Sequence, residues 1–316
     1  MRFVYVMDPM NGVLPDKDTS YAFQRAAQNR GHEALHCGLH ELRVEGGEVV
    51  AKIRPLKVVN EAPWFTHDAY GEVRLSDVDA IFIRKDPPFD SAYLYATLML
   101  ELVRDKTVIV NDPRGLRDAN EKLYALHFAK HMPKTIVTTL QDRILAFLDS
   151  VGGQAVIKPL DGAGGSNVLK LEKGSSNTKA IIEILTKNGR ELAMVQEYLP
   201  AVKQGDKRVL LLDGEVLGGI LRVPQGGDLR SNIHVGGTVE PCEVTAEERA
   251  VVADIAPRLK KDGLIFVGLD MIGGRLTEVN VTSPTGIQEL GRHVQRDVAE
   301  DVIAWVENAV TARKKK

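Results

Sequence analysis

The sequence has little of what marks several protein classes. Its 316 residues include only two cysteines, Cys37 and Cys242, which excludes a disulfide framework and suits two reduced thiols. No apolar run approaches the roughly 18 residues that a membrane-spanning helix requires. The apolar run at residues 3–7 ends in an acid and a proline and is too short for the core of a signal peptide. We therefore expect a cytoplasmic protein without a membrane partner.

A surplus of charge of one sign is also missing. Lys and Arg together number 41 and Asp and Glu 43, which makes the formal net charge -2. Because nucleic-acid-binding domains usually carry a basic surplus, we expect no nucleic-acid partner. The composition, with 44% apolar and 27% charged residues, is that of a globular chain. The length suggests two or three domains.

The order of the predicted elements indicates an α/β fold. Up to about residue 111, short β runs alternate with helical segments, which predicts a mainly parallel sheet with helices on its faces. Further helices are expected at residues 118–130, 142–151, 178–187 and 246–261, and one more reaches about residue 312. A polar loop with four glycines spans residues 224–241, and a loop of this length is usually functional.

A lysine followed by a glycine-rich segment is the first candidate binding site. Lys158 ends a predicted strand, so its ammonium group points into the adjoining cleft, and Gly162, Gly164 and Gly165 let backbone N–H groups approach a phosphate. The segment lacks the Gly-Lys-Ser/Thr ending of a P-loop, and it returns into a strand instead of opening a helix. A flexible hairpin with an incidental lysine explains these residues equally well.

Acidic and amide side chains in an otherwise apolar hairpin form the second candidate. Glu278 and Asn280 lie two apart on a predicted strand, so both point to one face. A three-residue loop at residues 273–275 would place Asp270 across from Glu278, whereas a two-residue turn would send Asp270 to the opposite face. Two carboxylates and an amide oxygen suit Mg²⁺, which shares its other positions with water and phosphate. A solvated sheet face is the alternative, and the apolar flanks favour the metal.

Two arginines and a connecting segment complete the candidates. Arg208 and Arg222 interrupt apolar β runs, where an unpaired guanidinium would be costly, so they suit a phosphate or carboxylate ligand, or structural salt bridges. The strand end at residues 196–199, with Asp206 in the following segment, could hold a purine and a ribose. A plain connection between two subdomains is the simpler explanation of that segment alone.

Taken in order, these features resemble the ATP-grasp superfamily, and more narrowly the bacterial glutathione synthetases over essentially the whole chain. The resemblance rests on the segments 6–9, 84–90, 116–122, 158–165, 205–209, 266–270 and 277–284. It implies an N-terminal pre-ATP-grasp domain with a parallel sheet at residues 1–121, followed by an ATP-grasp fold whose two subdomains clamp ATP. These subdomains are expected at residues 122–199, with a glycine-rich lid, and at residues 200–316, with the metal site.

The resemblance also implies the reaction, which is ATP-dependent ligation of γ-glutamylcysteine and glycine to glutathione through an acyl phosphate, with ADP and phosphate as the other products. ATP is then a co-substrate, and Mg²⁺, with Mn²⁺ as the alternative, is the cofactor. An acyl phosphate hydrolyses in open water, so a lid is expected, with residues 162–165 and 226–237 as the candidates. The family further implies a homo-oligomer, a tetramer.

The resemblance assigns roles to particular residues by motif. Those expected to bind ATP are Lys122, Lys158, Gly162, Gly164, Gly165, Gln196, Glu197, Tyr198, Leu199, Asp206 and Arg208. The expected catalytic residues are Arg208 and Arg222, and the expected metal ligands are Asp270, Glu278 and Asn280. The expected dipeptide contacts are Lys17, Ser20, Arg84, Arg222 and Ser283. His234, in the long loop, is interpreted as a solvent-facing bystander and not as a base.

Two other functions are weighed against this one. The first is another ATP-grasp carboxylate–amine ligase, such as one that joins two D-alanines or adds glutamate to a protein terminus; segment 84–90 and the full-length match argue against it. The second is a catalytically silent ATP-binding regulatory protein. Arg208, Asp270, Glu278 and Asn280 argue against that function, because a protein that only binds ATP could lose them.

Overall fold

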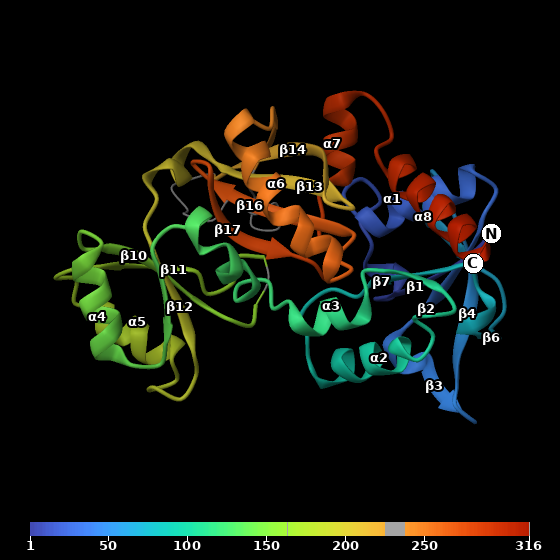
Figure 1. Cartoon of the computed structure of the whole chain (residues 1–316), viewed down its shortest axis with the longest axis horizontal. Helices are drawn as coiled ribbons and strands as arrows, with labels where there is room; N and C mark the ends of the chain where they lie inside the picture. Colours follow the sequence, from blue (N-terminus) through green and yellow to red (C-terminus); the bar gives the residue numbers. More distant parts are fainter. Residues whose placement is uncertain (163, 225–237, 316) are drawn as a thin grey trace.

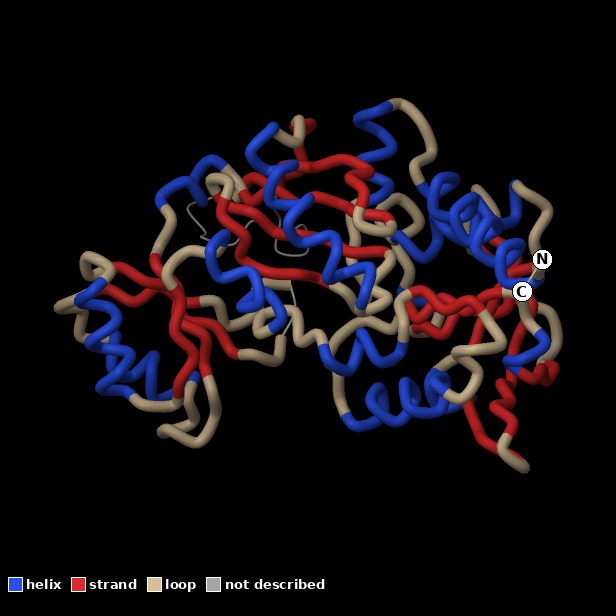
Figure 2. The backbone as a smooth tube through the Cα atoms, viewed as in Figure 1, coloured by secondary structure: helices blue, strands red, loops and turns tan. Residues whose placement is uncertain are grey.

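The computed structural model describes residues 1–162, 164–224 and 238–315, and their strands form three sheets of eight, four and five strands. Figure 1 and Figure 2 show the sheets in a row, with the four-stranded sheet at one end, the five-stranded sheet in the middle and the eight-stranded sheet at the other end. None of the helices in the described ranges has the length and apolar character needed to span a bilayer.

The eight-stranded sheet has a parallel centre made of buried apolar strands. Its strand order is β3-β4-β2-β1-β7-β8, with β5 and β6 paired to β4, and the neighbours β2, β1, β7 and β8 run parallel. Its strands are β1 (Arg2–Met7), β2 (Glu33–Cys37), β3 (Leu42–Glu45), β4 (Glu48–Val58), β5 (Phe65–His67), β6 (Gly71–Arg74), β7 (Ala80–Arg84) and β8 (Val108–Val110). The predicted parallel sheet is confirmed for β2, β1, β7 and β8, and the pairs that β4 makes with β2, β3, β5 and β6 are antiparallel.

Three helices of this part begin in the same way. They are α1 (Thr19–Asn29), α2 (Ser91–Glu101) and α3 (Pro113–Asp118). Each follows an aspartate, Asp18, Asp90 or Asp112, whose carboxylate accepts a hydrogen bond from a backbone N–H of the first turn. This capping satisfies amide groups that have no partner inside the helix. Short 3₁₀ turns connect other elements: η1 (Met10–Gly12), η2 (Leu39–Glu41), η3 (Leu75–Asp77) and η5 (Pro200–Gln204).

The four-stranded sheet is antiparallel and carries its own small core. Its order is β11-β10-β12-β9, from β9 (Thr135–Thr138), β10 (Gln154–Pro159), β11 (Leu169–Glu172) and β12 (Ala193–Glu197). Helices α4 (Gln141–Ser150) and α5 (Thr178–Leu185) pack together on one face (Figure 1). Their buried Ile144, Leu148 and Ile182 meet Ile157 and Val195 of the sheet. The opposite face is thereby left for the site.

The five-stranded sheet is antiparallel, in the order β15-β14-β13-β16-β17. The strands are β13 (Asp206–Leu212), β14 (Glu215–Val223), β15 (Thr238–Cys242), β16 (Phe266–Ile272) and β17 (Arg275–Asn280). Because side chains alternate along a strand, Val209 and Leu211 pack in the core cluster that includes helix α6 (Ala246–Lys261), whereas Leu210 and Leu212 pack with residues of the last two helices. Arg208 therefore lies on the face away from α6.

The prediction of one α-helix at residues 118–130 is wrong. Helix α3 ends at Asp118, and a 3₁₀ helix, η4 (Tyr124–His131), replaces the rest, with a break at Phe128. The cause is Asn120, whose side-chain oxygen accepts hydrogen bonds from the backbone N–H of Lys122 and Leu123. Asparagine often competes with helix in this way.

The prediction of a single helix at the end of the chain is also wrong, because two helices are present there: α7 (Ile287–Val294) and α8 (Ala299–Lys314). Gln295 after α7 adopts a φ of +54°, and the N–H of Arg296 donates to the carbonyl of Gly291, which ends the helix. Helix α8 then packs beside α1, so both chain ends lie at the same end of the molecule (Figure 1).

Candidate functional site

A cavity of about 590 Å³ lies between the three sheets. This volume is within the range of about 300–1,000 Å³ that small-molecule sites occupy. Seventeen of the residues singled out in the sequence line it: Lys17, Lys122, Lys158, Gly162, Gly164, Gly165, Gln196, Glu197, Tyr198, Leu199, Asp206, Arg208, Arg222, Asp270, Glu278, Asn280 and Ser283. Segments far apart in the sequence therefore meet in one place.

The β16–β17 hairpin brings Asp270 and Glu278 together in an unexpected way. Its turn has two residues, Gly273 and Gly274, since Ile272 pairs with Arg275. Of the two turns that the sequence left open, the structure has the two-residue turn. A register shift follows between Met271, which pairs with Leu276, and Asp270, which pairs with Glu278, so β17 carries one extra residue, Thr277. This β-bulge restores the facing pair that a two-residue turn alone would have separated.

Arg208 is held against the hairpin by Asp270. The two residues are opposite each other on β13 and β16, and the guanidinium donates to both carboxylate oxygens, Nη2 to Oδ2 at 2.9 Å. Gly268 lets this side chain lie close to β16, because a Cβ atom there would sit 2.8 Å from Arg208 Cδ. The bidentate contact fixes the plane of the guanidinium.

Arg222 joins the same buried cluster from β14. It lies opposite Asp206, and its Nη2 is 2.5 Å from Asp206 Oδ2 and 3.0 Å from Asp270 Oδ1. The residues Arg208, Arg222 and Asp270 are only 6%, 4% and 5% exposed. Both arginines thus form ion pairs, and they do so on the wall of the cavity, so the salt-bridge and ligand interpretations of the sequence are compatible.

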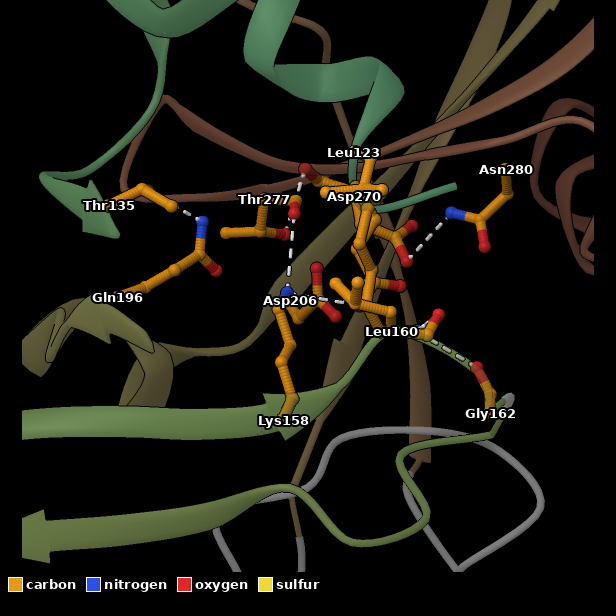
Figure 3. A network of polar contacts seen from close by, with 12 residues as sticks. Leu123, Thr135, Lys158, Leu160, Gly162, Gln196, Asp206, Asp270, Thr277 and Asn280 are labelled. Carbon is orange, nitrogen blue, oxygen red and sulfur yellow. Dashed lines mark hydrogen bonds and ion pairs between the residues drawn. The ribbon is translucent and has the colours of Figure 1, made fainter. Parts of the chain in front are cut away.

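Two lysines act on Glu278 from outside the hairpin, Lys158 from β10 and Lys122 from the segment between α3 and η4. Lys158, at the end of β10, has its Nζ 3.0 Å from Glu278 Oε1 and 3.3 Å from the Thr277 carbonyl oxygen, as Figure 3 illustrates for Thr277. Lys122 Nζ donates to the carbonyl of Gly162 at 2.9 Å. Lys158 therefore connects the four-stranded sheet to the hairpin, and Lys122 connects the glycine-rich segment to the segment before η4.

The acidic groups of the cluster have shifted pKa values. Burial opposes the charge of Asp270, but the Arg208 and Arg222 guanidinium groups outweigh it and hold the pKa of Asp270 well below its usual range. Burial likewise opposes the charge of Glu278, and Lys158 with Lys122 nevertheless lowers its pKa. For Asp206 burial is the largest effect and raises the pKa. Asp270 and Glu278 are therefore carboxylates at neutral pH.

The donor set fits a hard divalent cation. Asp270, Glu278 and Asn280 share one face, and the Asn280 amide nitrogen donates to Asp270 Oδ2 at 3.1 Å (Figure 3), which leaves the amide oxygen as a potential ligand. The described part of the chain has no cluster of three or more His, Cys, Asp or Glu suited to a metal. Two carboxylates and an amide oxygen match Mg²⁺, which completes its shell with water and phosphate oxygens.

The strand end at residues 196–199 borders the cavity, and two of its hydrogen bonds go to β9 and to the residue before it. Gln196 Nε2 donates to Thr135 Oγ1 at 3.1 Å (Figure 3), and the backbone N–H of Glu197 donates to the Lys134 carbonyl. Adenine binding by this edge stays a prediction.

Two predicted dipeptide contacts do not line the cavity. Arg84 is 4% exposed, lies near the rings of Phe23 and Phe266, and donates to Ser20 Oγ at 3.1 Å and to the Pro284 carbonyl at 3.0 Å. Arg84 and Ser20 therefore support the segment that carries Ser283 from behind. Residues 226–237, the second lid candidate with His234, and Ala163 of the first lie outside the described residues.

Several lining residues were missed by the sequence reasoning. Glu121 accepts a hydrogen bond from Thr282 Oγ1 at 2.8 Å, and Asp18 and Glu289 line the far end of the cavity. The adjacency of Glu121 to Lys122 could have drawn attention to Glu121. Nothing local marks Glu289, because an acid in the first turn of a helix is ordinary.

Comparison with known proteins agrees with this geometry. A family model described as the N-terminal domain of prokaryotic glutathione synthetase matches residues 1–117, and the model of its ATP-grasp domain matches residues 121–295. The glutathione synthetase of Synechococcus elongatus is 45% identical, with 98% of this chain and 99% of that one covered. That of Escherichia coli O157:H7 is 42% identical, with 98% and 97% covered.

Solved structures show the same fold at low identity. D-cycloserine synthetase DcsG superposes with a TM-score of 0.66 at 16% identity, covering 98% of this chain and 99% of that chain. The ATP-grasp ligase PsnB, solved with its minimal precursor, Mg and ADP, has a TM-score of 0.62 at 16% identity and covers 100% and 98%. The predicted fold class, an α/β N-terminal domain followed by an ATP-grasp fold, is confirmed.

Proposed function

The chain belongs to the prokaryotic glutathione synthetase family, and from this premise we propose that it joins γ-glutamylcysteine to glycine, forming glutathione, ADP and phosphate from ATP. As a member of that family it is an ATP-dependent ligase. The observation that carries the proposal is the convergence of Lys158, Arg208 and Arg222 with Asp270 and Glu278 on one cavity. Phosphoryl transfer needs this inventory of fixed charges and no protein nucleophile.

The proposed reaction has two steps. The cysteine carboxylate of the dipeptide attacks the γ-phosphorus of ATP, and the bond to the β,γ-bridging oxygen breaks, which releases ADP and leaves an acyl phosphate. The glycine amine then attacks the acyl carbon, loses a proton, and phosphate leaves. Arg208 and Arg222 lie where they can neutralise the charge of the transferring phosphoryl group, and Lys122 and Lys158 are the proposed contacts of the other phosphates.

A divalent cation held by Asp270, Glu278 and Asn280 would supply further charge neutralisation at the phosphate oxygens. Mg²⁺ is the proposed ion, with Mn²⁺ as the alternative. In the structure, Glu278 is paired with Lys158, and Asp270 is paired with Arg208 and Arg222. We infer an exchange of partners on binding, in which Lys158, Arg208 and Arg222 would turn to phosphate oxygens, and Asp270 and Glu278 would be free to hold a cation. Such an exchange keeps the buried charges compensated throughout.

The domain limits, the nucleotide contacts, the partners, the assembly and the cellular location are proposed on the same basis. We propose a division at residues 1–121, 122–199 and 200–316, with adenine against residues 196–199 and the ribose near Asp206. Small molecules are the proposed partners, and a cytoplasmic homotetramer is the proposed state. Light scattering on the protein as it elutes from a size-exclusion column would give the mass of the assembly directly.

The central experiment is an amine-dependence assay. The protein is incubated with ATP, Mg²⁺ and γ-glutamylcysteine, with and without glycine, and phosphate release and product mass are measured. Glycine-dependent phosphate release with formation of glutathione is expected. Release that depends on D-alanine or glutamate instead would indicate another ATP-grasp carboxylate–amine ligase. ATP binding without release under any amine would indicate a silent binding protein.

A further inference from the structure

The far end of the cavity holds a buried carboxylate that the proposed chemistry does not use. Glu289 lies in the first turn of α7 and lines the cavity, yet its side chain is only 5% exposed. Oε1 is 3.4 Å from Nη2 of Arg292. Among the residues that the structure describes, Oε2 has no hydrogen-bond partner. Buried carboxylate oxygens normally accept a hydrogen bond. A ligand bound in the cavity could supply the donor that Oε2 lacks.

The position of Glu289 is fixed by its neighbours in the sequence. Gln288 Nε2 donates to the carbonyls of Pro15 at 2.8 Å and Asp18 at 2.6 Å, which ties α7 to the segment before α1. Arg292 Nη1 donates to the Asp16 carbonyl at 2.7 Å. The same segment contributes Lys17 and Asp18 to the cavity wall. This end of the cavity thus combines fixed acids with one lysine.

The same end is linked to the reaction centre. Arg208 Nη1 donates to the carbonyl of Thr285, which lies four residues before Glu289. Arg208 and Glu289 line the same cavity, so a ligand that fills it can contact both. Burial raises the pKa of Glu289, whereas its own backbone N–H, Arg292 and Lys17 oppose this, so a cationic ligand group would favour its charged form.

We propose that Glu289 binds the free α-ammonium group of the γ-glutamyl residue, while Lys17 faces the α-carboxylate of the same residue. The inference rests on the proposed function, because it assumes that γ-glutamylcysteine is the acid substrate. The γ-linkage leaves both α groups of that residue free, and they form a zwitterion that an acid and a lysine can recognise together. Glycine suits Glu289 less well, because its amine must be deprotonated to react.

The test compares γ-glutamylcysteine with glutarylcysteine, which lacks only the α-amino group. For Glu289→Gln, kcat/KM with γ-glutamylcysteine should fall about 10- to 100-fold, mainly through KM, because a charge-assisted hydrogen bond is lost. With glutarylcysteine it should change little. Lys17→Met should lower kcat/KM for both dipeptides alike, because both keep the carboxylate. Glu183→Gln on α5, which removes an exposed carboxylate outside the cavity, is the matched control.

A structural role for Glu289 predicts a different result. If Glu289→Gln lowers kcat/KM for both dipeptides by the same factor, or raises the KM of glycine alone, the inference is wrong. Should the glutamine variant not fold, Glu289→Asp replaces it and should keep part of the preference for the amino group. Calorimetry measures the affinity of the wild-type protein and of the variants for the two dipeptides, and it separates this inference from the proposed function. If the protein makes no glutathione, the proposed function is wrong. If the wild-type protein binds both dipeptides with equal affinity, the role of Glu289 is wrong.

Discussion

At the scale of single residues, the site is a set of opposite charges that contact one another. Arg208 and Arg222 both contact Asp270, and Lys158 contacts Glu278. Each group is thus oriented by its partner, and the cost of burying it is offset. Ligand entry would require the exchange of partners proposed above.

Replacing Glu278 tests this arrangement directly. Glu278→Gln removes a carboxylate proposed to hold the metal and leaves Lys158 without its ionic partner. We expect turnover to fall about 100-fold or more, because charge neutralisation at the transferring phosphoryl group is lost. ATP affinity should change modestly, since Lys158 is then released to contact phosphate. Steady-state kinetics and a nucleotide-binding titration measure the two effects.

The control for this change is Glu183→Gln, which makes the same substitution on the exposed side of α5. Its turnover should equal that of the wild-type protein. Turnover of Glu278→Gln at the wild-type level would contradict the metal assignment.

At the scale of elements, the β16–β17 hairpin decides which side chains face the cavity. The alternation of apolar and polar residues predicted both strands and the shared face of Glu278 and Asn280. It did not predict the bulge at Thr277, because a strand of six residues is too short for one extra residue to leave a visible break in the alternation. The end of α3 before Asn120 and the separation of α7 from α8 were missed for a related reason. Each depends on a side-chain or backbone hydrogen bond and not on periodicity.

Gly268→Ala tests how closely β16 must approach Arg208. The added Cβ would lie 2.8 Å from Arg208 Cδ and 3.1 Å from Pro284 Cβ, so the guanidinium must move. We expect kcat to fall about 10- to 100-fold, because a displacement of about 1 Å is enough to misalign a catalytic group. ATP affinity, measured by titration, should be largely kept.

Gly71→Ala on β6 is the matched control, because its Cβ would meet only Ile53 Cδ1, at an ordinary 3.5 Å. That variant should keep full activity. A Gly268→Ala enzyme with wild-type kcat would mean that Arg208 can be displaced without consequence, contrary to the role proposed for it.

At the scale of the whole molecule, the last helix closes the chain onto its beginning. Glu307 of α8 is 2.5 Å from Arg30 Nη2 and 2.6 Å from His32 Nε2, and Arg30 also contacts Glu300. Composition predicted a globular chain, and alternation predicted its sheets, but neither indicated that α8 would pack on α1. Such a contact depends on residues about 270 positions apart, which no local pattern encodes.

This closure predicts a dependence of stability on pH. Hydrogen bonds from Arg30 and, to a lesser degree, His32 lower the pKa of Glu307 to about 2, from an ordinary value of 4.5. A carboxyl group with a lowered pKa in the folded state stabilises that state fully above its unfolded-state pKa, and the stabilisation is lost as the pH falls toward the folded-state pKa. Glu307→Gln should therefore lower the free energy of unfolding at pH 7 by about 1–2 kcal/mol, a value reduced for partial solvent exposure.

Urea unfolding of the wild-type protein and of Glu307→Gln at pH 7, 5, 4 and 3 measures the effect. The two free energies should converge between pH 5 and pH 2, because protonation then removes from the wild-type protein the charge that the variant already lacks. Glu191→Gln, which breaks an exposed pair with Lys187, should show little difference at any of these values. A difference for Glu307→Gln that stayed constant with pH would mean that the side chain acts through packing and not through its charge.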